Sequence, residues 1–157
     1  MTPPGDERVR LAAGLGAALF AVHCLRFLPP DRALDDAWIT FRVARNLVEA
    51  GVPTFDLSRP AVEGATSPLW TAISAALLRL GLDPVAPARV LGASFGAGAV
   101  WLGALTAAEN TPTGGDPVRA ALVTGLCLAA FGGLGFHAAG GMETGLWLLL
   151  VAALLRA

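Results

Sequence analysis

The chain contains no lysine, no tyrosine and only two cysteines among its 157 residues. All 11 basic residues are therefore arginines, and with 12 acidic residues the net charge is −1. This balance provides no basic face for nucleic acid, so we expect no nucleic-acid partner. Cys24 and Cys127 lie within apolar stretches and make neither a disulfide framework nor a metal motif. The sequence also lacks a Walker loop, a zinc-binding Cys/His spacing and a G-x-S-x-G elbow.

Hydrophobic residues make up 55% of the chain and the mean hydropathy is +0.63, values typical of a membrane protein. The first apolar run, residues 9–28, begins beside Arg8 and Arg10 and ends before Pro29 and Pro30. A secretory signal has an apolar core of about 7–15 residues and a small-residue cleavage site. Because this run is longer and lacks such an end, we expect an uncleaved signal anchor, with a cleaved signal peptide as the alternative.

The lengths of the apolar runs predict how often the chain crosses a bilayer. A crossing needs about 20 helical residues. Residues 9–28, 84–107 and 118–136 are long enough. Gly140 and Gly141 are expected to break the helix, and residues 142–157 begin a further span. Gly92 and Gly96 form a GxxxG pair that permits close helix packing, although a chain with 19 glycines produces such pairs by chance. We predict an all-α polytopic transmembrane bundle of about four spans.

The first polar segment after the signal anchor reads as a short amphipathic helix over residues 35–50. Either Asp35 or Asp36 is expected to be its N-cap, and Gly51 to end it. The expected polar face consists of Arg42, Arg45, Asn46 and Glu49, and the expected apolar face of Ile39, Val43 and Leu47.

A second short helix is predicted over residues 68–80, with Pro68 in its first turn and Gly81 at its end. It would be roughly 20 Å long at 1.5 Å per residue, which is less than the hydrocarbon core of roughly 30 Å. We therefore expect a juxtamembrane helix at the interface, with a short, distorted crossing as the alternative. If it does not cross, the acidic residues Asp35, Asp36, Glu63 and Glu143 share one membrane face. If it crosses, Glu143 lies on the opposite face.

Each candidate site residue has a structural and a functional interpretation. As structural residues, Asp35 and Asp36 would cap a helix and occupy its first turn. As functional residues, one would be a general base with the other beside it. Arg42 and Arg45 fit a solvated helix face or a phosphate site. As structural residues, Glu63 would be a solvated loop residue and Glu143 an acid at the start of a helix. As functional residues, both would be partner carboxylates for the two aspartates at a membrane surface. Residue type and spacing alone do not decide between these interpretations.

Three motifs bear a family resemblance. They are residues 35–46 (DDAWITFRVARN), 62–70 (VEGATSPLW) and 141–144 (GMET). In this order they resemble the N-terminal part of polytopic GT-C glycosyltransferases, most closely the actinobacterial terminal arabinofuranosyltransferase type. The resemblance extends from the first span to Ala157.

The resemblance implies a multi-pass plasma-membrane enzyme whose active face is extracytoplasmic. It would move a sugar, arabinofuranose or a hexose, from a polyprenyl-phosphate donor to a cell-envelope glycan or lipid acceptor. Asp35 would be the catalytic base with Asp36 beside it, and Glu63, Glu143, Arg42 and Arg45 would bind substrate. A divalent metal is a possible cofactor, with Asp36, Glu63 and Glu143 as candidate ligands.

The chain departs from this family in length. Relatives are several times longer, so residues 1–157 are expected to be the N-terminal part of such a transmembrane domain, inactive without the rest. The rival class is a non-enzymatic small polytopic membrane protein or a transporter fragment, which would not need three acidic motifs on one face.

Overall fold

The computed structural model describes residues 4–26, 33–58 and 67–157. These residues form helices and no strand, which confirms the all-α class. The helices are α1 (Pro4–Cys24), α2 (Asp35–Ala50), α3 (Pro68–Arg79), α4 (Val85–Glu109), α5 (Pro117–Ala130), α6 (Gly132–Ala139) and α7 (Thr144–Leu154).

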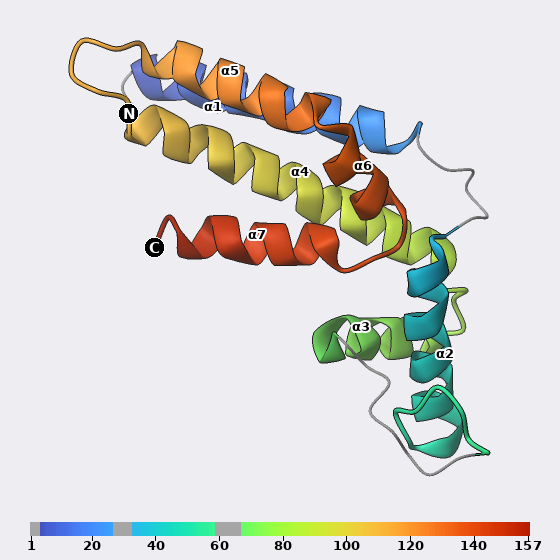
Figure 1. The fold of residues 1–157 in the computed structure, drawn as a ribbon. Helices are drawn as coiled ribbons and strands as arrows, with labels where there is room; N and C mark the ends of the chain where they lie inside the picture. Colours follow the sequence, from blue (N-terminus) through green and yellow to red (C-terminus); the bar gives the residue numbers. More distant parts are fainter. Residues whose placement is uncertain (1–3, 27–32, 59–66) are drawn as a thin grey trace.

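The long helices form one bundle, and the short helices α2 and α3 lie at one end of it. α1, α4 and α5 pack side by side, and α7 lies along α4 (Figure 1). α2 packs against α3 beyond one end of the bundle, and α7 ends near the opposite end (Figure 1). α2 and α3 are therefore held together at the end where the loop between α6 and α7 also lies.

Glycines allow the long helices to approach closely. A Cβ added to Gly16 would lie 2.7 Å from the Cα of Gly125, and one added to Gly145 would lie 2.3 Å from the carbonyl oxygen of Gly92. Gly96 faces the ring of Phe20, which a Cβ would approach to 2.5 Å. Both members of the GxxxG pair are thus at helix contacts, where a larger residue would not fit.

We expect Gly92→Ala to destabilise the bundle. The new Cβ would lie 2.2 Å from the carbonyl oxygen of Ala138, so backbone must move. Overpacking of this kind costs about 1–3 kcal/mol, measurable as a lower Tm in detergent. Gly14→Ala is the control, because a Cβ there meets nothing within 4 Å. A Tm for Gly92→Ala equal to that of the control would contradict the close contact.

The prediction of about four spans is supported only in part. In the described part of the chain, α4 is long and apolar enough to cross a membrane. Residues 118–136 are not one straight helix, because the chain breaks at Phe131 and α5 and α6 are bent by 61°. Counted as one broken span, this pair gives a second candidate.

The outer runs also differ from their predicted bounds. The apolar part of α1 ends at Cys24 rather than continuing to residue 28, and residues 27–32, with Pro29 and Pro30, lie outside the described residues. α1 is 21 residues long, but Asp6, Glu7 and two arginines occupy its first turns. α7 has 11 residues, fewer than a full crossing needs.

The predicted bounds of α2 and α3 hold to within one residue. α2 covers residues 35–50, and Gly51 ends it in the left-handed conformation at φ 73°. α3 ends at Arg79, one residue before the predicted end. The predicted N-cap of α2 was wrong, because Leu34 occupies that position and Asp35 and Asp36 form the first turn. Acidic side chains are favoured there by the helix dipole.

Candidate functional site

A hollow of about 450 Å³ lies beside α2 and contains three of the predicted site residues, Asp35, Arg42 and Arg45. We call it the α2 hollow. Its described lining residues are Asp35, Trp38, Ile39, Phe41, Arg42, Arg45, Phe55, Asp83 and Pro84. One carboxylate and two guanidinium groups of a single helix therefore face one space.

The helical repeat explains why these side chains meet. Asp35 and Arg42 are seven residues apart, about two turns, and Arg45 follows one turn later. Another side of the helix is apolar, and Ala37 and Phe41 are buried in the core cluster that contains Trp70, with Phe41 at the border of the hollow. Burial of that side leaves the charged side facing the hollow. Ile39 was predicted on the apolar face of the helix, but its side chain is exposed and lines the hollow.

The hollow also has an aromatic wall from the loop after α2. The ring of Phe55 lies under the guanidinium of Arg42, with the Cζ atom 5.9 Å from the ring centroid, a cation–π geometry. The next residue, Asp56, accepts hydrogen bonds from the hydroxyl and N–H of Ser58. These bonds, with the nearby charge of Arg42, hold the pKa of the Asp56 carboxyl below its ordinary value. The surroundings of Arg42 thus include an aromatic face and the negative charge of Asp56.

The three motifs of the family resemblance meet around Trp70. This side chain, from the second motif, is fully buried in the cluster that contains Ala37 and Phe41 of the first. Its indole N–H donates to the carbonyl oxygen of Gly141, in the third motif, over 2.9 Å. Gly141 has φ 83° and closes the turn before α7, as the predicted break at this position requires.

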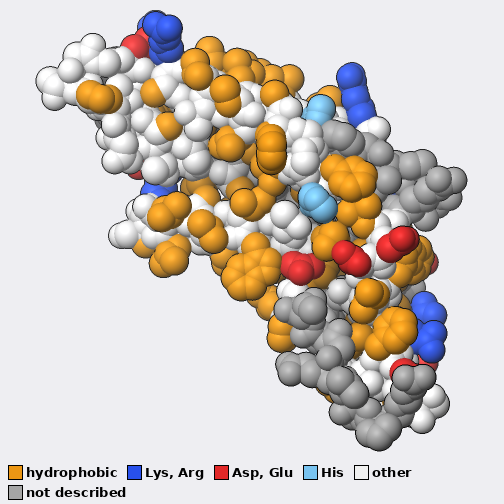
Figure 2. Space-filling model, in the orientation of Figure 1, with side chains coloured by type: hydrophobic (Ala, Val, Ile, Leu, Met, Phe, Trp, Pro, Cys, Tyr) orange, Lys and Arg blue, Asp and Glu red, His pale blue; other side chains and the backbone are white. Residues whose placement is uncertain are grey.

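Glu143 is held near the start of α2 by this turn. The N–H of Leu34 donates to the carbonyl oxygen of Gly140 over 2.9 Å. Glu143 itself is partly buried and immediately precedes α7. Figure 2 shows acidic side chains in a row where this turn meets the start of α2. The tertiary structure therefore brings Glu143 to the same end of the molecule as Asp35 and Asp36.

The predicted site is nevertheless divided. Among the described residues that line the α2 hollow, neither Asp36 nor Glu143 is present. Glu63 lies outside the described residues. Within the described ranges, no three His, Cys, Asp or Glu side chains are grouped so as to hold a metal ion. A metal bound by Asp36, Glu63 and Glu143 stays a prediction.

Two residues of the hollow were missed from the sequence as site residues. Asp83 immediately precedes the predicted span over residues 84–107, and its carboxylate accepts from the N–H of Val85 over 2.9 Å. Phe55 lies in a loop without a recognisable motif. Both are distant in sequence from Asp35, and only the packing of α4 and the loop against α2 brings them together.

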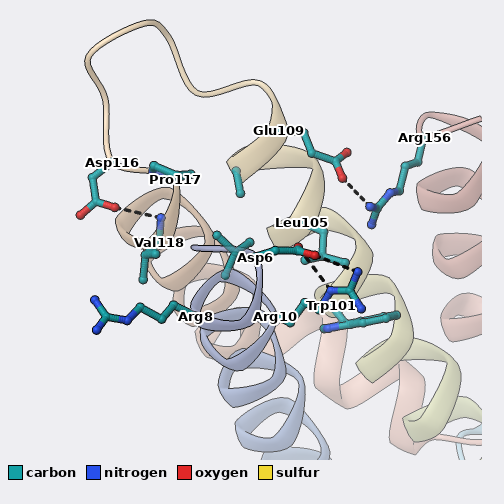
Figure 3. A pocket seen from close by; sticks show the side chains of 12 residues that line it. Asp6, Arg8, Arg10, Trp101, Leu105, Glu109, Asp116, Pro117, Val118 and Arg156 are labelled. Carbon is teal, nitrogen blue, oxygen red and sulfur yellow. Dashed lines mark hydrogen bonds and ion pairs between the residues drawn. The ribbon is translucent and has the colours of Figure 1, made fainter. Parts of the chain in front are cut away.

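A larger hollow, about 730 Å³, lies at the opposite end of the bundle (Figure 3). Its charged groups are largely engaged with one another. Arg10 pairs with Asp6 at 3.1 Å, and Arg156 pairs with Glu109. Asp116 accepts from the N–H groups of Val118 and Arg119 and so caps α5. These contacts join helix ends, and none of the predicted site residues lines this hollow among the described residues.

Comparisons with protein-family models, with curated proteins and with solved structures found no match for this chain. The likeness to GT-C glycosyltransferases therefore rests on the three sequence motifs.

Proposed function

We propose that the chain is the N-terminal part of a GT-C-type membrane glycosyltransferase. It would transfer a sugar, arabinofuranose or a hexose, from a polyprenyl-phosphate donor to a cell-envelope glycan or lipid acceptor. The observation that supports this most is the shared hollow of Asp35, Arg42 and Arg45. A carboxylate and two guanidinium groups are the groups that such a transfer needs.

In the proposed reaction, Asp35 removes the proton of the acceptor hydroxyl. The acceptor oxygen attacks the anomeric carbon, forming the new glycosidic bond while the bond from that carbon to the phosphate oxygen breaks. The transition state is oxocarbenium-like, and a neighbouring carboxylate stabilises it. We assign this role to Asp36, which follows Asp35 in the first turn of α2 but is not among the described residues that line the hollow. Arg42 and Arg45 neutralise the charge on the departing lipid phosphate. The proton ends on Asp35.

Glu63 and Glu143 are proposed to contact substrate around this centre. Glu143 is supported by the turn that ties it to the start of α2. A divalent metal held by Asp36, Glu63 and Glu143 would supply further positive charge for the phosphate. No step above is routed through it.

Location in a membrane is supported by the apolar outer surface of the bundle, and the plasma membrane is what the family resemblance implies. Large hydrophobic side chains are exposed along α1, α4, α5 and α7, among them Leu11, Leu15, Val90, Val123, Trp147 and Leu154. Figure 2 shows such side chains spread over the visible face of these helices. An extensive exposed apolar surface fits a lipid bilayer.

The direct test is an assay of sugar transfer. Membranes containing the protein that carries this chain are supplied with a labelled polyprenyl-phosphate sugar, and label is followed into glycan or lipid. Transfer should depend on this protein. Equal transfer by membranes without it would refute the proposal and favour the non-enzymatic class.

A second prediction concerns topology: Glu143 and Asp36 lie on the same, extracytoplasmic face. Single cysteines replace Asp36, Glu143 or the exposed Thr113 in a background lacking Cys24 and Cys127. A membrane-impermeant thiol reagent should label the first two in intact cells, and Thr113→Cys only after permeabilisation, because Thr113 lies in the loop at the other end. Labelling of Glu143→Cys only after permeabilisation would mean that α3 crosses, which removes Glu143 from the site.

A further inference from the structure

Asn46 is buried, with 4% of its surface exposed, although its spacing placed it on the polar face of α2. Its side-chain amide donates to two successive carbonyl oxygens, that of Thr54 at 2.7 Å and that of Phe55 at 3.2 Å. Both belong to the loop that turns back along α2 after Gly51. Asn46 thus belongs to the polar face of α2 by spacing but is buried, because its amide satisfies these carbonyl groups.

This contact fixes the position of Phe55. The Phe55 side chain is 50% exposed, so burial of its ring does not by itself hold it in place. The backbone on both sides is restrained instead, by Asn46 and by the hydroxyl of Thr54, which donates to the carbonyl oxygen of Asp56. The ring is thereby kept against the guanidinium of Arg42.

We propose that Asn46 is a positioning residue that holds Phe55 beneath Arg42 and so presets the Arg42 guanidinium to bind a phosphate group in the α2 hollow. This inference rests on the proposed function, which supplies the phosphate of the sugar donor. An arginine side chain has many rotamers, and restraining it before binding removes part of the entropic cost of capture. A purely structural Asn46 would satisfy the loop carbonyls without affecting phosphate binding.

The experiment measures binding and loop order in the same detergent-solubilised chain. The probes are a short-chain prenyl phosphate and the corresponding prenyl alcohol, which differ only in the phosphate. The variants are Asn46→Ala, which removes the donor, and Phe55→Leu, which keeps an apolar wall but loses the aromatic face. Asn110→Ala is the control, because the Asn110 amide makes a similar bond, to the carbonyl oxygen of Thr106, at the end of α4.

We expect the wild-type chain to prefer the phosphate over the alcohol. Asn46→Ala should weaken binding of the phosphate by about tenfold through misplacement of Arg42, and Phe55→Leu by about two- to fivefold through loss of the cation–π contact. Neither variant should change binding of the alcohol. Hydrogen exchange of the amides in residues 52–58 should be faster in Asn46→Ala, and both measurements should be unchanged in Asn110→Ala.

The outcomes separate this inference from the proposed function. Unchanged hydrogen exchange in Asn46→Ala, or faster exchange with unchanged phosphate binding, would overturn the positioning role while the phosphate site stands. A wild-type chain with no preference for phosphate over alcohol would overturn the phosphate site itself. Should Asn46→Ala fail to fold, the exposed Phe55→Leu variant decides: full phosphate affinity in that variant overturns the role of the wall.

Discussion

Replacing Asp35 with asparagine should lower the rate of sugar transfer by about 10²–10⁴-fold in the protein that contains this chain. The substitution keeps the size of the side chain and removes its basicity, so the acceptor hydroxyl is no longer deprotonated. Because Leu34 occupies the N-cap position of α2, the loss cannot come from removal of a cap. The measurement is transfer from a labelled polyprenyl-phosphate sugar at equal protein level.

The control for Asp35→Asn is Glu49→Gln, an equivalent change on the same helix. Glu49 is exposed near the end of α2 and is not among the described residues of the hollow. Its transfer rate should stay within about twofold of wild type, as for other surface substitutions. Asp36→Asn should also impair transfer, by weaker stabilisation of the transition state. An Asp35→Asn rate equal to that of Glu49→Gln would remove Asp35 as the base.

Replacing Trp70 with alanine should lower the free energy of unfolding by about 3–5 kcal/mol, the range for large buried aromatics. The side chain is fully buried and meets Phe95 edge to face, with ring centroids 6.5 Å apart. It also donates the hydrogen bond to Gly141 that ties the turn before α7 to α3. Trp70→Phe keeps much of the apolar contact and removes the donor, so it should cost about 1–3 kcal/mol.

Denaturation in detergent, followed by circular dichroism, measures both effects. Trp147→Ala is the control, since Trp147 lies on α7 with its side chain largely exposed. In detergent it should change the free energy of unfolding by no more than about 0.5 kcal/mol. A Trp70→Ala protein as stable as Trp147→Ala would show that Trp70 does not hold the three motifs together.

These expected effects describe two separate roles at one end of the molecule. Trp70 joins α2, α3 and the turn at Gly141 from within the core. Asp35 and the arginines lie on the outer side of α2, facing the hollow. Packing around Trp70 therefore sets the orientation of α2 and of its charged face. The charged groups themselves are proposed to bind substrate and to take part in the reaction.

Features that depend on neighbouring residues could be read from the sequence. The helix over residues 35–50 was predicted because apolar positions recur at helical spacing and because Gly51 adopts a positive φ at little cost. The break at Gly140 and Gly141 was predicted for the same reason, and Gly141 does adopt φ 83°. The short length of α3 followed from the glycine after it. Backbone conformational preference decides these features locally.

Other features depended on contacts between distant segments, and only the tertiary structure decided them. Asn46 fits a polar face by spacing, but two carbonyl groups of the folded-back loop bind its amide. Residues 118–136 are apolar enough for one helix, yet the chain bends by 61° at Phe131. The α2 hollow needs Phe55 and Asp83, which packing alone brings to Asp35. Helical periodicity orders residues along one element, whereas hydrogen-bond satisfaction and close packing act between elements, so the site is formed only when the chain is folded.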